Sequence, residues 1–406
     1  MKQFILAAVC VFILGCTGPS KVGKVARQKA HDRMDLVNAD LASQQARQQF
    51  EVGQLSSALS TIGVAITRYP EKAEYHQLRG RILLEQHKLD DAKKSFELAS
   101  SLNPESAHPQ YLLGVLYQRW GDDEAALQAY STASENDESH AQFFLAKAET
   151  LVSLDRIDEA IALLHSDHTF KHQASIPALL GQIYLRIGNP SLAAQYLADS
   201  KALGNDDLIL VSDLIVAQFQ AGLYAECLMT FREFEMTSET ALTSLQRRIK
   251  GKSLAATGRL IEGRDVCLTV TRESPQDADA WIDLGYISWK MGDYRRLKQC
   301  GSEICTLTPS RVEGPLFLGI AAKQSGNVDL AAQSFATAQS LAENGEIAHW
   351  IATASEQLGG KNAIDPQEVA NMPAKTAEIL AEEPILGLVE GSEPMVTVPQ
   401  QLPQYP

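Results

Sequence analysis

The sequence predicts an all-α protein in which helical hairpins repeat along the middle of the chain. Residues 107–140 carry Leu113-Gly114, Gly121, Ala126 and Tyr130, and a similar order returns 34 residues earlier and from residue 312. From residue 278, Leu284-Gly285 and Gly292 return. No run alternates apolar and polar residues as a half-buried strand does. Apolar residues make up 45% and charged residues 21% of the chain, which excludes wholesale disorder.

The recurring residues have physical roles in a helical hairpin. A glycine such as Gly114 lets the paired helix approach closely, and Gly121 stands where the first helix must stop and turn. Pro104 and Pro309 end second helices, because proline lacks the amide hydrogen. Rings such as Tyr130 are expected to fill the space between one repeat and the next. We count nine repeats over residues 39–345, starting at 39, 73, 107, 141, 174, 208, 244, 278 and 312.

This pattern resembles the tetratricopeptide repeat (TPR), a helix–turn–helix unit of 34 residues. The resemblance implies a right-handed superhelical solenoid of about nine repeats, in which each repeat buries its apolar face on its neighbours. Such an array needs capped ends. Residues 346–360 predict a C-terminal capping helix with Trp350 facing inward, ended by Gly359-Gly360.

The beginning of the chain has the features of an export signal. Lys2 precedes an apolar run of eleven residues from Phe4 to Leu14, which Gly15 and Cys16 follow. Eleven helical residues span about 16 Å, which is about half the hydrocarbon core of a bilayer. Residues 1–15 therefore predict a signal peptide and no membrane-spanning helix.

The end of that signal resembles a bacterial lipobox, Ile13-Leu14-Gly15-Cys16, although Leu14 replaces the small residue usual at its position. The resemblance implies that Cys16 becomes the acylated N-terminus of the mature protein. It would anchor the protein to the cell membrane or the outer membrane on the exported, periplasm-facing side, and Thr17 favours the outer one. The alternative is an ordinary secretory signal without lipid.

Residues 16–38 predict a basic tether between the lipid and the array. Two interpretations stay open. The tether rests on anionic headgroups, with a binding free energy of about 1 kcal/mol per cation, or it is a solvated linker. Its cations are Lys21, Lys24, Arg27, Lys29 and Arg33.

The other end of the chain, residues 361–406, predicts a disordered tail. It holds seven of the 16 prolines, and seven acids against Lys361 and Lys375. Such a composition cannot bury a core. The tail is expected to be solvated, with docking to a partner as the alternative.

The resemblance places partner binding on the inner, concave face formed by the first helices. Its mixture of apolar, arginine and aromatic side chains suits a peptide or helix of another protein, although some of these residues could instead pack on adjacent helices. The lining residues are Gln77, Arg81, Tyr111, Val115, Arg119, Leu145, Glu149, Gln182, Arg186, Ile282, Tyr286, Trp289, Leu316 and Ile320.

A chaperone's C-terminal tail is not the expected ligand. Family members that bind such tails carry Lys and Asn at the fifth and ninth positions of the first repeat. Here Ser43 and Arg47, or Gln77 and Arg81, occupy those positions.

Neither enzymatic nor metal chemistry has a clear signature in the sequence. Patterns for nucleophilic serine, zinc-protease, P-loop and dinucleotide sites are absent, so we expect no catalytic residue and no cofactor. His165, His168 and His172 could offer metal ligands, but they fall between two repeats and are better interpreted as a solvated junction. A net charge of −14 argues against nucleic-acid binding.

Four cysteines follow the signal and Cys16 in the predicted array. Two interpretations stay open for them: buried free thiols, or a disulfide of Cys267 with one of the last two. They are Cys227, Cys267, Cys300 and Cys305.

These features together predict a non-enzymatic, lipid-anchored scaffold that binds envelope proteins during pilus, secretion or outer-membrane assembly. The alternative is an accessory or regulatory subunit of an envelope polysaccharide or cell-wall synthase. An enzyme would need a site within the less regular repeats 4–7, and we disfavour it.

Overall fold

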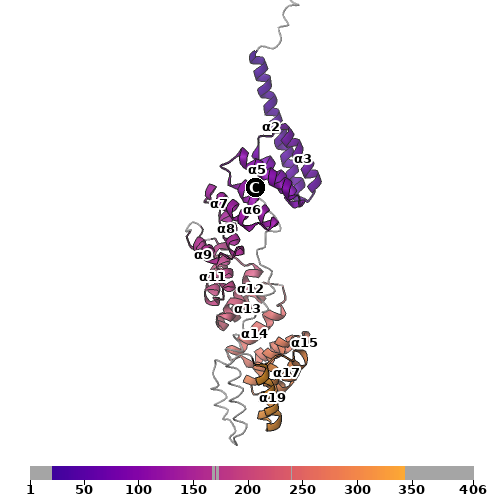
Figure 1. The fold of residues 1–406 in the computed structure, drawn as a ribbon, viewed down its shortest axis with the longest axis vertical. Coiled ribbons are helices and arrows are strands. Elements are labelled where there is room, and N and C mark those ends of the chain that lie inside the picture. Colours follow the sequence, from indigo (N-terminus) through magenta and orange to yellow (C-terminus); the bar gives the residue numbers. More distant parts are fainter. Residues whose placement is uncertain (1–20, 167–169, 171–172, 239, 343–406) are drawn as a thin grey trace, which may run out of the picture. The chain divides into compact units, whose positions relative to one another are not determined.

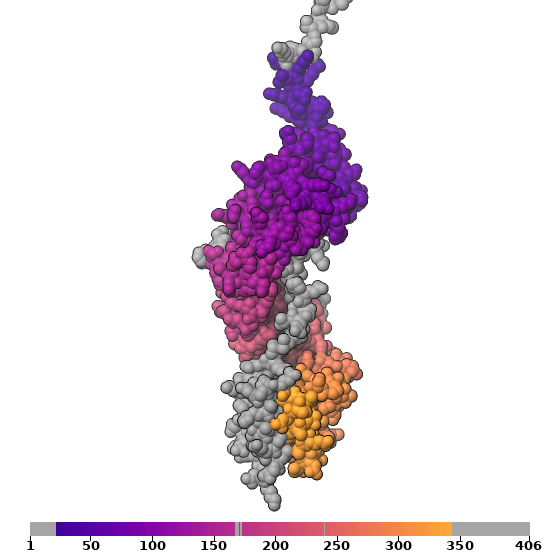
Figure 2. All heavy atoms as spheres, in the orientation of Figure 1, coloured from indigo at the N-terminus to yellow at the C-terminus, as the bar shows by residue number. Residues whose placement is uncertain are grey.

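The structure is a computed structural model that describes residues 21–166, 170, 173–238 and 240–342 (Figures 1 and 2). These residues form two compact units, which we call unit 1 (residues 21–166) and unit 2 (residues 170–342). The predicted signal peptide, Cys16, the capping helix and the tail lie outside the described residues.

Unit 1 consists of four helical hairpins. In each hairpin a first helix is followed by a second, antiparallel one. The pairs are α2 (Lys21–Glu51) with α3 (Leu55–Arg68), α4 (Ala73–Glu85) with α5 (Leu89–Leu102), α6 (Ala107–Trp120) with α7 (Asp123–Asn136), and α8 (Ala141–Ser153) with α9 (Ile157–Ser166).

Unit 2 consists of five hairpins of the same kind. The pairs are α10 (Ser175–Arg186) with α11 (Pro190–Ala202), α12 (Leu208–Gln220) with α13 (Tyr224–Thr237), α14 (Ser244–Ala256) with α15 (Leu260–Glu273), α16 (Ala278–Lys290) with α17 (Tyr294–Leu307), and α18 (Glu313–Gln324) with α19 (Val328–Leu341).

Helices are the only regular structure among the described residues. Within each unit the second helix of one hairpin packs on the first helix of the next, as α5 does on α6 and α15 on α16. First helices of successive hairpins also touch, for example α2 with α4 and α4 with α6. The predicted all-α fold of stacked hairpins is confirmed, and each unit presents a face formed by its first helices.

Every hairpin turn contains one residue with a positive φ. Seven of these nine residues are glycines, such as Gly121 at φ +78°, whereas His87 and Asp155 adopt φ values of 56° and 59°. The left-handed conformation closes the first helix and starts the turn, which is why glycine is favoured there.

The first helix of the chain is much longer than the others. α2 begins at Lys21 and has 31 residues, so the described part of the segment predicted as a tether is helical. No glycine or proline interrupts the sequence between Gly23 and Gly53. Lys, Arg, Ala and Gln favour helix throughout this stretch.

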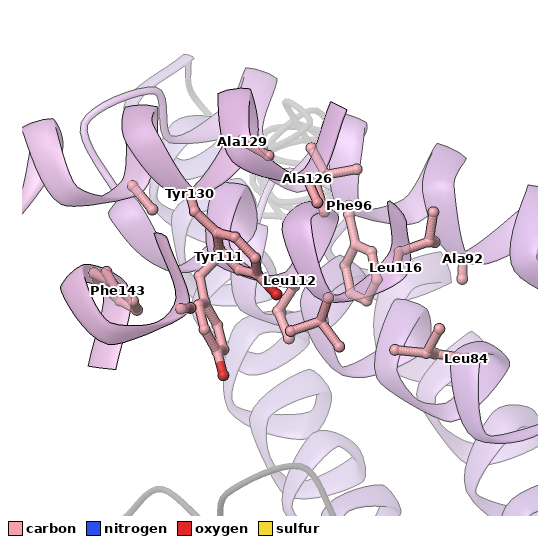
Figure 3. Packing of buried hydrophobic residues seen from close by; sticks show 14 of the residues in the cluster. Leu84, Ala92, Phe96, Tyr111, Leu112, Leu116, Ala126, Ala129, Tyr130 and Phe143 are labelled. Atoms are coloured by element: carbon pink, nitrogen blue, oxygen red, sulfur yellow. The ribbon is translucent and has the colours of Figure 1, made fainter. Parts of the chain in front are cut away.

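In four hairpins, α4–α5, α6–α7, α10–α11 and α18–α19, a glycine of the first helix faces a large side chain of the second. A Cβ atom on Gly114 of α6 would lie 2.4 Å from Cε1 of Tyr130 on α7. Figure 3 shows the Tyr130 ring packed beside Tyr111 and Leu112 in the same cluster. A larger residue at position 114 would force the two helices apart.

These rings lie differently from the sequence prediction. Phe96, Tyr130 and Phe335 pack against the glycine of their own hairpin, so they join its two helices and not only one repeat to the next. The space over Gly285 is filled from the following hairpin, by Phe317 of α18. This exchange occurs because the ring position of the α16–α17 hairpin is Gly301.

We expect Gly114→Ala to lower the free energy of unfolding by about 1–3 kcal/mol, the usual effect of overpacking a core. The methyl group would overlap the Tyr130 ring, which is only 1% exposed and has no free space to move into. The shift in the urea midpoint, followed by circular dichroism, measures the effect.

Gly63→Ala on α3 is the matched control, because no atom lies within 4 Å of its added Cβ. Alanine favours helix over glycine by up to about 1 kcal/mol, so this variant should be unchanged or slightly stabilised. Equal destabilisation by the two substitutions would contradict the packing role of Gly114.

Candidate functional site

A pocket of about 470 Å³ opens on the first-helix face of unit 1. Side chains of α2, α4, α6 and α8 line it, together with residues of the turns before α6 and α8. The lining residues are Arg47, Glu74, Gln77, Leu78, Arg81, Glu105, Ser106, Ala107, His108, Asn136, Asp137, His140 and Phe143.

The inner wall of this pocket is apolar and aromatic. Leu78 and Phe143 are buried. The His140 ring stacks on Phe143 with centroids 4.4 Å apart, and the His108 ring lies 6.3 Å from Phe143. Leu78 and Phe143 belong to the packed core of unit 1, and the two histidines are half-buried beside them.

Positive groups surround the histidine inside the pocket. Burial, together with the nearby Arg81 and His140, lowers the pKa of His108 to about 4. The Arg81 guanidinium lies 5.2 Å from the centre of the Phe50 ring. The exposed carboxylates of Glu74 and Glu105 lie among the pocket's lining residues, so both signs of charge are present. This combination suits polar or acidic groups held against an aromatic wall.

Two of the predicted partner-binding residues, Gln77 and Arg81, line this pocket. Tyr111 and Val115 are placed otherwise than expected, since each is only 3% exposed. The Tyr111 ring lies 5.1 Å from Phe143 and 5.6 Å from Tyr130, and these neighbours cover it. In this structure both residues therefore contribute packing, with little surface for a partner.

Three further predicted residues lie on α6 and α8. Arg119 donates to a carboxylate oxygen of Glu85 at 3.0 Å and so ties α6 to α4. Leu145 and Glu149 are half-buried on α8. Burial raises the pKa of the Glu149 carboxyl to about 7.

The remaining predicted residues belong to unit 2, and they do not gather in one pocket. The Gln182 amide donates to Asp213 at 3.1 Å, whereas Arg186 is exposed. The Lys290 ammonium lies 4.8 Å from the centre of the Tyr286 ring. Ile282 and Trp289 pack, half-buried, against the core to which the buried Leu316 and Ile320 belong. Their role in partner binding stays a prediction.

An ion network on the first helices of unit 2 was missed by the sequence analysis. Arg248 of α14 donates to Asp283 of α16 at 2.7 Å and contacts Asp279 at 3.3 Å, while Arg311 contacts the other oxygen of Asp279 at 2.7 Å. Lys252 lies 3.6 Å from Asp283, which is 5% exposed. Arg248 and Lys252 occupy the fifth and ninth positions of their repeat. Gln77 and Arg81 were predicted from the same two positions of theirs, so the same criterion could have found Arg248 and Lys252.

The pocket in unit 1 also contains His108 and His140, which were not among the lining residues that the sequence analysis predicted. His140 comes from the turn before α8, where repeat positions carry no information.

The remaining sequence predictions concern a metal site, the cysteines and membrane-spanning helices in the residues that the structure describes. There, no group of three or more His, Cys, Asp or Glu side chains is arranged to hold a metal ion. His165 ends α9, and its predicted companions His168 and His172 lie outside the described residues. Cys227, Cys267, Cys300 and Cys305 are free thiols. No described helix is long and apolar enough to cross a membrane.

Comparison with protein families identifies the repeat. Residues 78–139, which run from α4 to the turn after α7, match the family model described as tetratricopeptide repeat. This part of the chain is similar to tetratricopeptide repeats. The match covers part of the array that the structure describes as one uninterrupted series of hairpins in unit 1.

Individual relatives are distant. The chain is 27% identical over 118 residues to anaphase-promoting complex subunit 3 of Schizosaccharomyces pombe, a match that covers 29% of this chain and 18% of that protein. Among solved structures, Pseudomonas aeruginosa pilF is 17% identical, covers 50% of this chain with 92% of its own, and has a TM-score of 0.41. The TPR domain of P58(IPK) is 16% identical and covers 80% of this chain with 99% of its own, at a TM-score of 0.29.

The raised pKa of Glu149 predicts a pH-dependent stability. A carboxyl in the unfolded chain ionises near pH 4.3, whereas the folded one stays protonated up to about pH 7. The unfolded state then binds fewer protons, so the free energy of unfolding falls as pH rises through this window and stays lower above it. We expect Glu149→Gln to remove this fall and to be the more stable protein at pH 8 by about 1–3 kcal/mol.

Urea midpoints at pH 5 and pH 8 measure the difference. Glu135→Gln is the control, because Glu135 is exposed on α7. An unchanged difference between the two pH values in Glu149→Gln would show that another group causes the dependence.

Proposed function

We propose that this protein is a non-enzymatic scaffold of a bacterial cell envelope, which a lipid on Cys16 holds to a membrane while the first-helix face of unit 1 binds other envelope proteins. Tetratricopeptide repeats bind protein partners and typically act as non-enzymatic scaffolds. The partners that we favour belong to pilus, secretion or outer-membrane assembly. An accessory role in a polysaccharide or cell-wall synthase is the alternative.

The observation that carries the proposal is the pocket between α2, α4, α6 and α8. Polar groups of Gln77, Arg81 and His108 converge there on the aromatic wall around Phe143. A partner segment can place an apolar side chain on that wall and polar or acidic groups beside the cations, as grooves for peptides do. A binding face of this kind gains strength from tethering, because a shared membrane raises the local concentration of both proteins.

Photo-crosslinking in native envelopes tests the pocket. A photoreactive amino acid at position 77 should form an adduct with one recurring partner. The same amino acid at position 128, an exposed residue on the second helix α7, should not. The identity of the adduct by mass spectrometry distinguishes an assembly component from a synthase. The same adduct from both positions would place binding elsewhere on the surface.

The lipid anchor has a separate test. Cys16→Ser should abolish metabolic labelling with palmitate and shift the protein from the membrane to the soluble fraction, because only the thiol of a lipobox cysteine receives the diacylglycerol. Cys305→Ser, which removes the one half-buried cysteine that the structure describes, is the control and should leave labelling unchanged. Palmitate on the Cys16→Ser protein would refute the anchor.

A further inference from the structure

The first half of α2 extends beyond the hairpin to which the helix belongs (Figures 1 and 2). From Val22 to Met34 all residues except Gly23 are exposed, with Val22 at 79% and Met34 at 66%. A helix of this length that is largely exposed is only marginally stable in water. The extension therefore calls for a surface on which it is stabilised.

One side of this extension is apolar. At 100° per residue, five apolar residues between Ala26 and Leu41 fall within an arc of about 80° around the helix axis, whereas the exposed Val25 projects about 140° from its centre. All are exposed, including Val37 and Leu41 at 64% each. We call this set the apolar stripe: Ala26, Ala30, Met34, Val37 and Leu41.

The stripe lies on the side of α2 where a preceding hairpin would stack. The residues of later hairpins that correspond to Leu41 are buried on their predecessor, as Tyr75 (1% exposed) and Phe143 (2%) are. Beyond Leu41, however, this side of α2 becomes polar, since Gln44 and Gln48 are exposed.

That polar change argues against another hairpin or a second copy as the occupant. The residues that correspond to Gln48 in the next two hairpins, Ile82 and Leu116, are both completely buried. A stacked hairpin would bury the amides of Gln44 and Gln48, at a free-energy cost unless each found a hydrogen bond. The occupant must therefore cover the stripe and leave these amides in water.

Basic side chains lie on both borders of the apolar stripe, and the acidic side chains lie on the opposite side of the helix. Arg27 and Arg33 project about 60° to either side of its centre, whereas Asp32 and Asp35 project about 140–160° away from it. On that far side Asp32 accepts from Gln28 at 2.9 Å, and Asp35 pairs with His31 at 2.7 Å. The surface that meets the stripe therefore meets basic groups on both borders and no carboxylate.

We propose that the first half of α2 is an interfacial helix that lies on an anionic lipid bilayer. The apolar stripe enters the boundary between headgroups and acyl chains, and Arg27, Lys29 and Arg33 reach lipid phosphates with their long side chains. Four residues separate Cys16 from Lys21, so an anchored Cys16 would hold the start of α2 within about 17 Å of the bilayer. The inference rests on the proposed membrane location, but not on acylation itself.

Hydrogen exchange of the full chain on lipid vesicles tests the inference. With vesicles of phosphatidylcholine and phosphatidylglycerol (7:3), amides of residues 24–37 should exchange about tenfold more slowly than with phosphatidylcholine alone. Arg27→Glu, Lys29→Glu and Arg33→Glu together should abolish this slowing, since loss of about 1 kcal/mol per cation weakens binding about a hundredfold. Met34→Ser with Val37→Ser should reduce it.

The matched control reverses three exposed cations of unit 2, Arg272, Arg295 and Lys298, and should retain the slowing. Equal exchange on both vesicles, or slowing that survives reversal of the α2 cations, would overturn the inference, as would protection that grows with protein concentration without lipid. If the protein isolated from its native membrane carries no lipid on Cys16 and still shows lipid-dependent protection, the anchor at Cys16 is refuted and the interfacial helix is supported.

Discussion

Close packing of the two helices is the constraint on which the hairpins depend, and in four of them it takes the form of a glycine that faces a large side chain of the partner helix. Gly80 faces Phe96 and Gly114 faces Tyr130, each with no room for a methyl group. The second helix therefore lies close over the first, and its ring fills the interior of the hairpin. Because this packing is complete within and between immediate neighbours, the outward side of the first helices is free to vary in size and charge. The pocket of unit 1 and the ion network of unit 2 are two results of that freedom.

Much of the fold could be predicted because its determinants are local. Spaced glycines, alanines and prolines specify helix ends and close contacts wherever they occur, so the all-α fold follows from the pattern itself. The exchange at Gly285 could not be predicted, because a missing ring at Gly301 does not reveal that Phe317 of the next hairpin fills the space. The extension of α2 was missed for another reason. A basic composition is compatible with both helix and linker, and only the absence of glycine and proline favours the helix.

The site was predictable only to the extent that repeat position determines exposure. Gln77 and Arg81 line the pocket as expected, but Tyr111 is covered by Phe143 of the following hairpin. A rule based on position has no information on the size of that neighbour. Turn residues such as His140 lie outside any such rule, since turns tolerate many sequences.

The first-helix faces of unit 1 and unit 2 differ in the charged groups around His108 and Arg248. At His108 burial is the main cause of the lowered pKa and Arg81 adds to it, while the pocket around it holds both arginines and carboxylates. At Arg248 burial also lowers the pKa, but the carboxylate of Asp283 outweighs it and the pKa is raised, so the surroundings are negative. In the pocket of unit 1 a partner segment can meet Arg47 and Arg81 beside carboxylates that are not buried. At Arg248 it would have to displace Asp283 and leave that buried carboxylate with Lys252 as its remaining ion-pair partner, which is unfavourable. The network in unit 2 is therefore suited to holding successive hairpins together, and the pocket in unit 1 to receiving a partner.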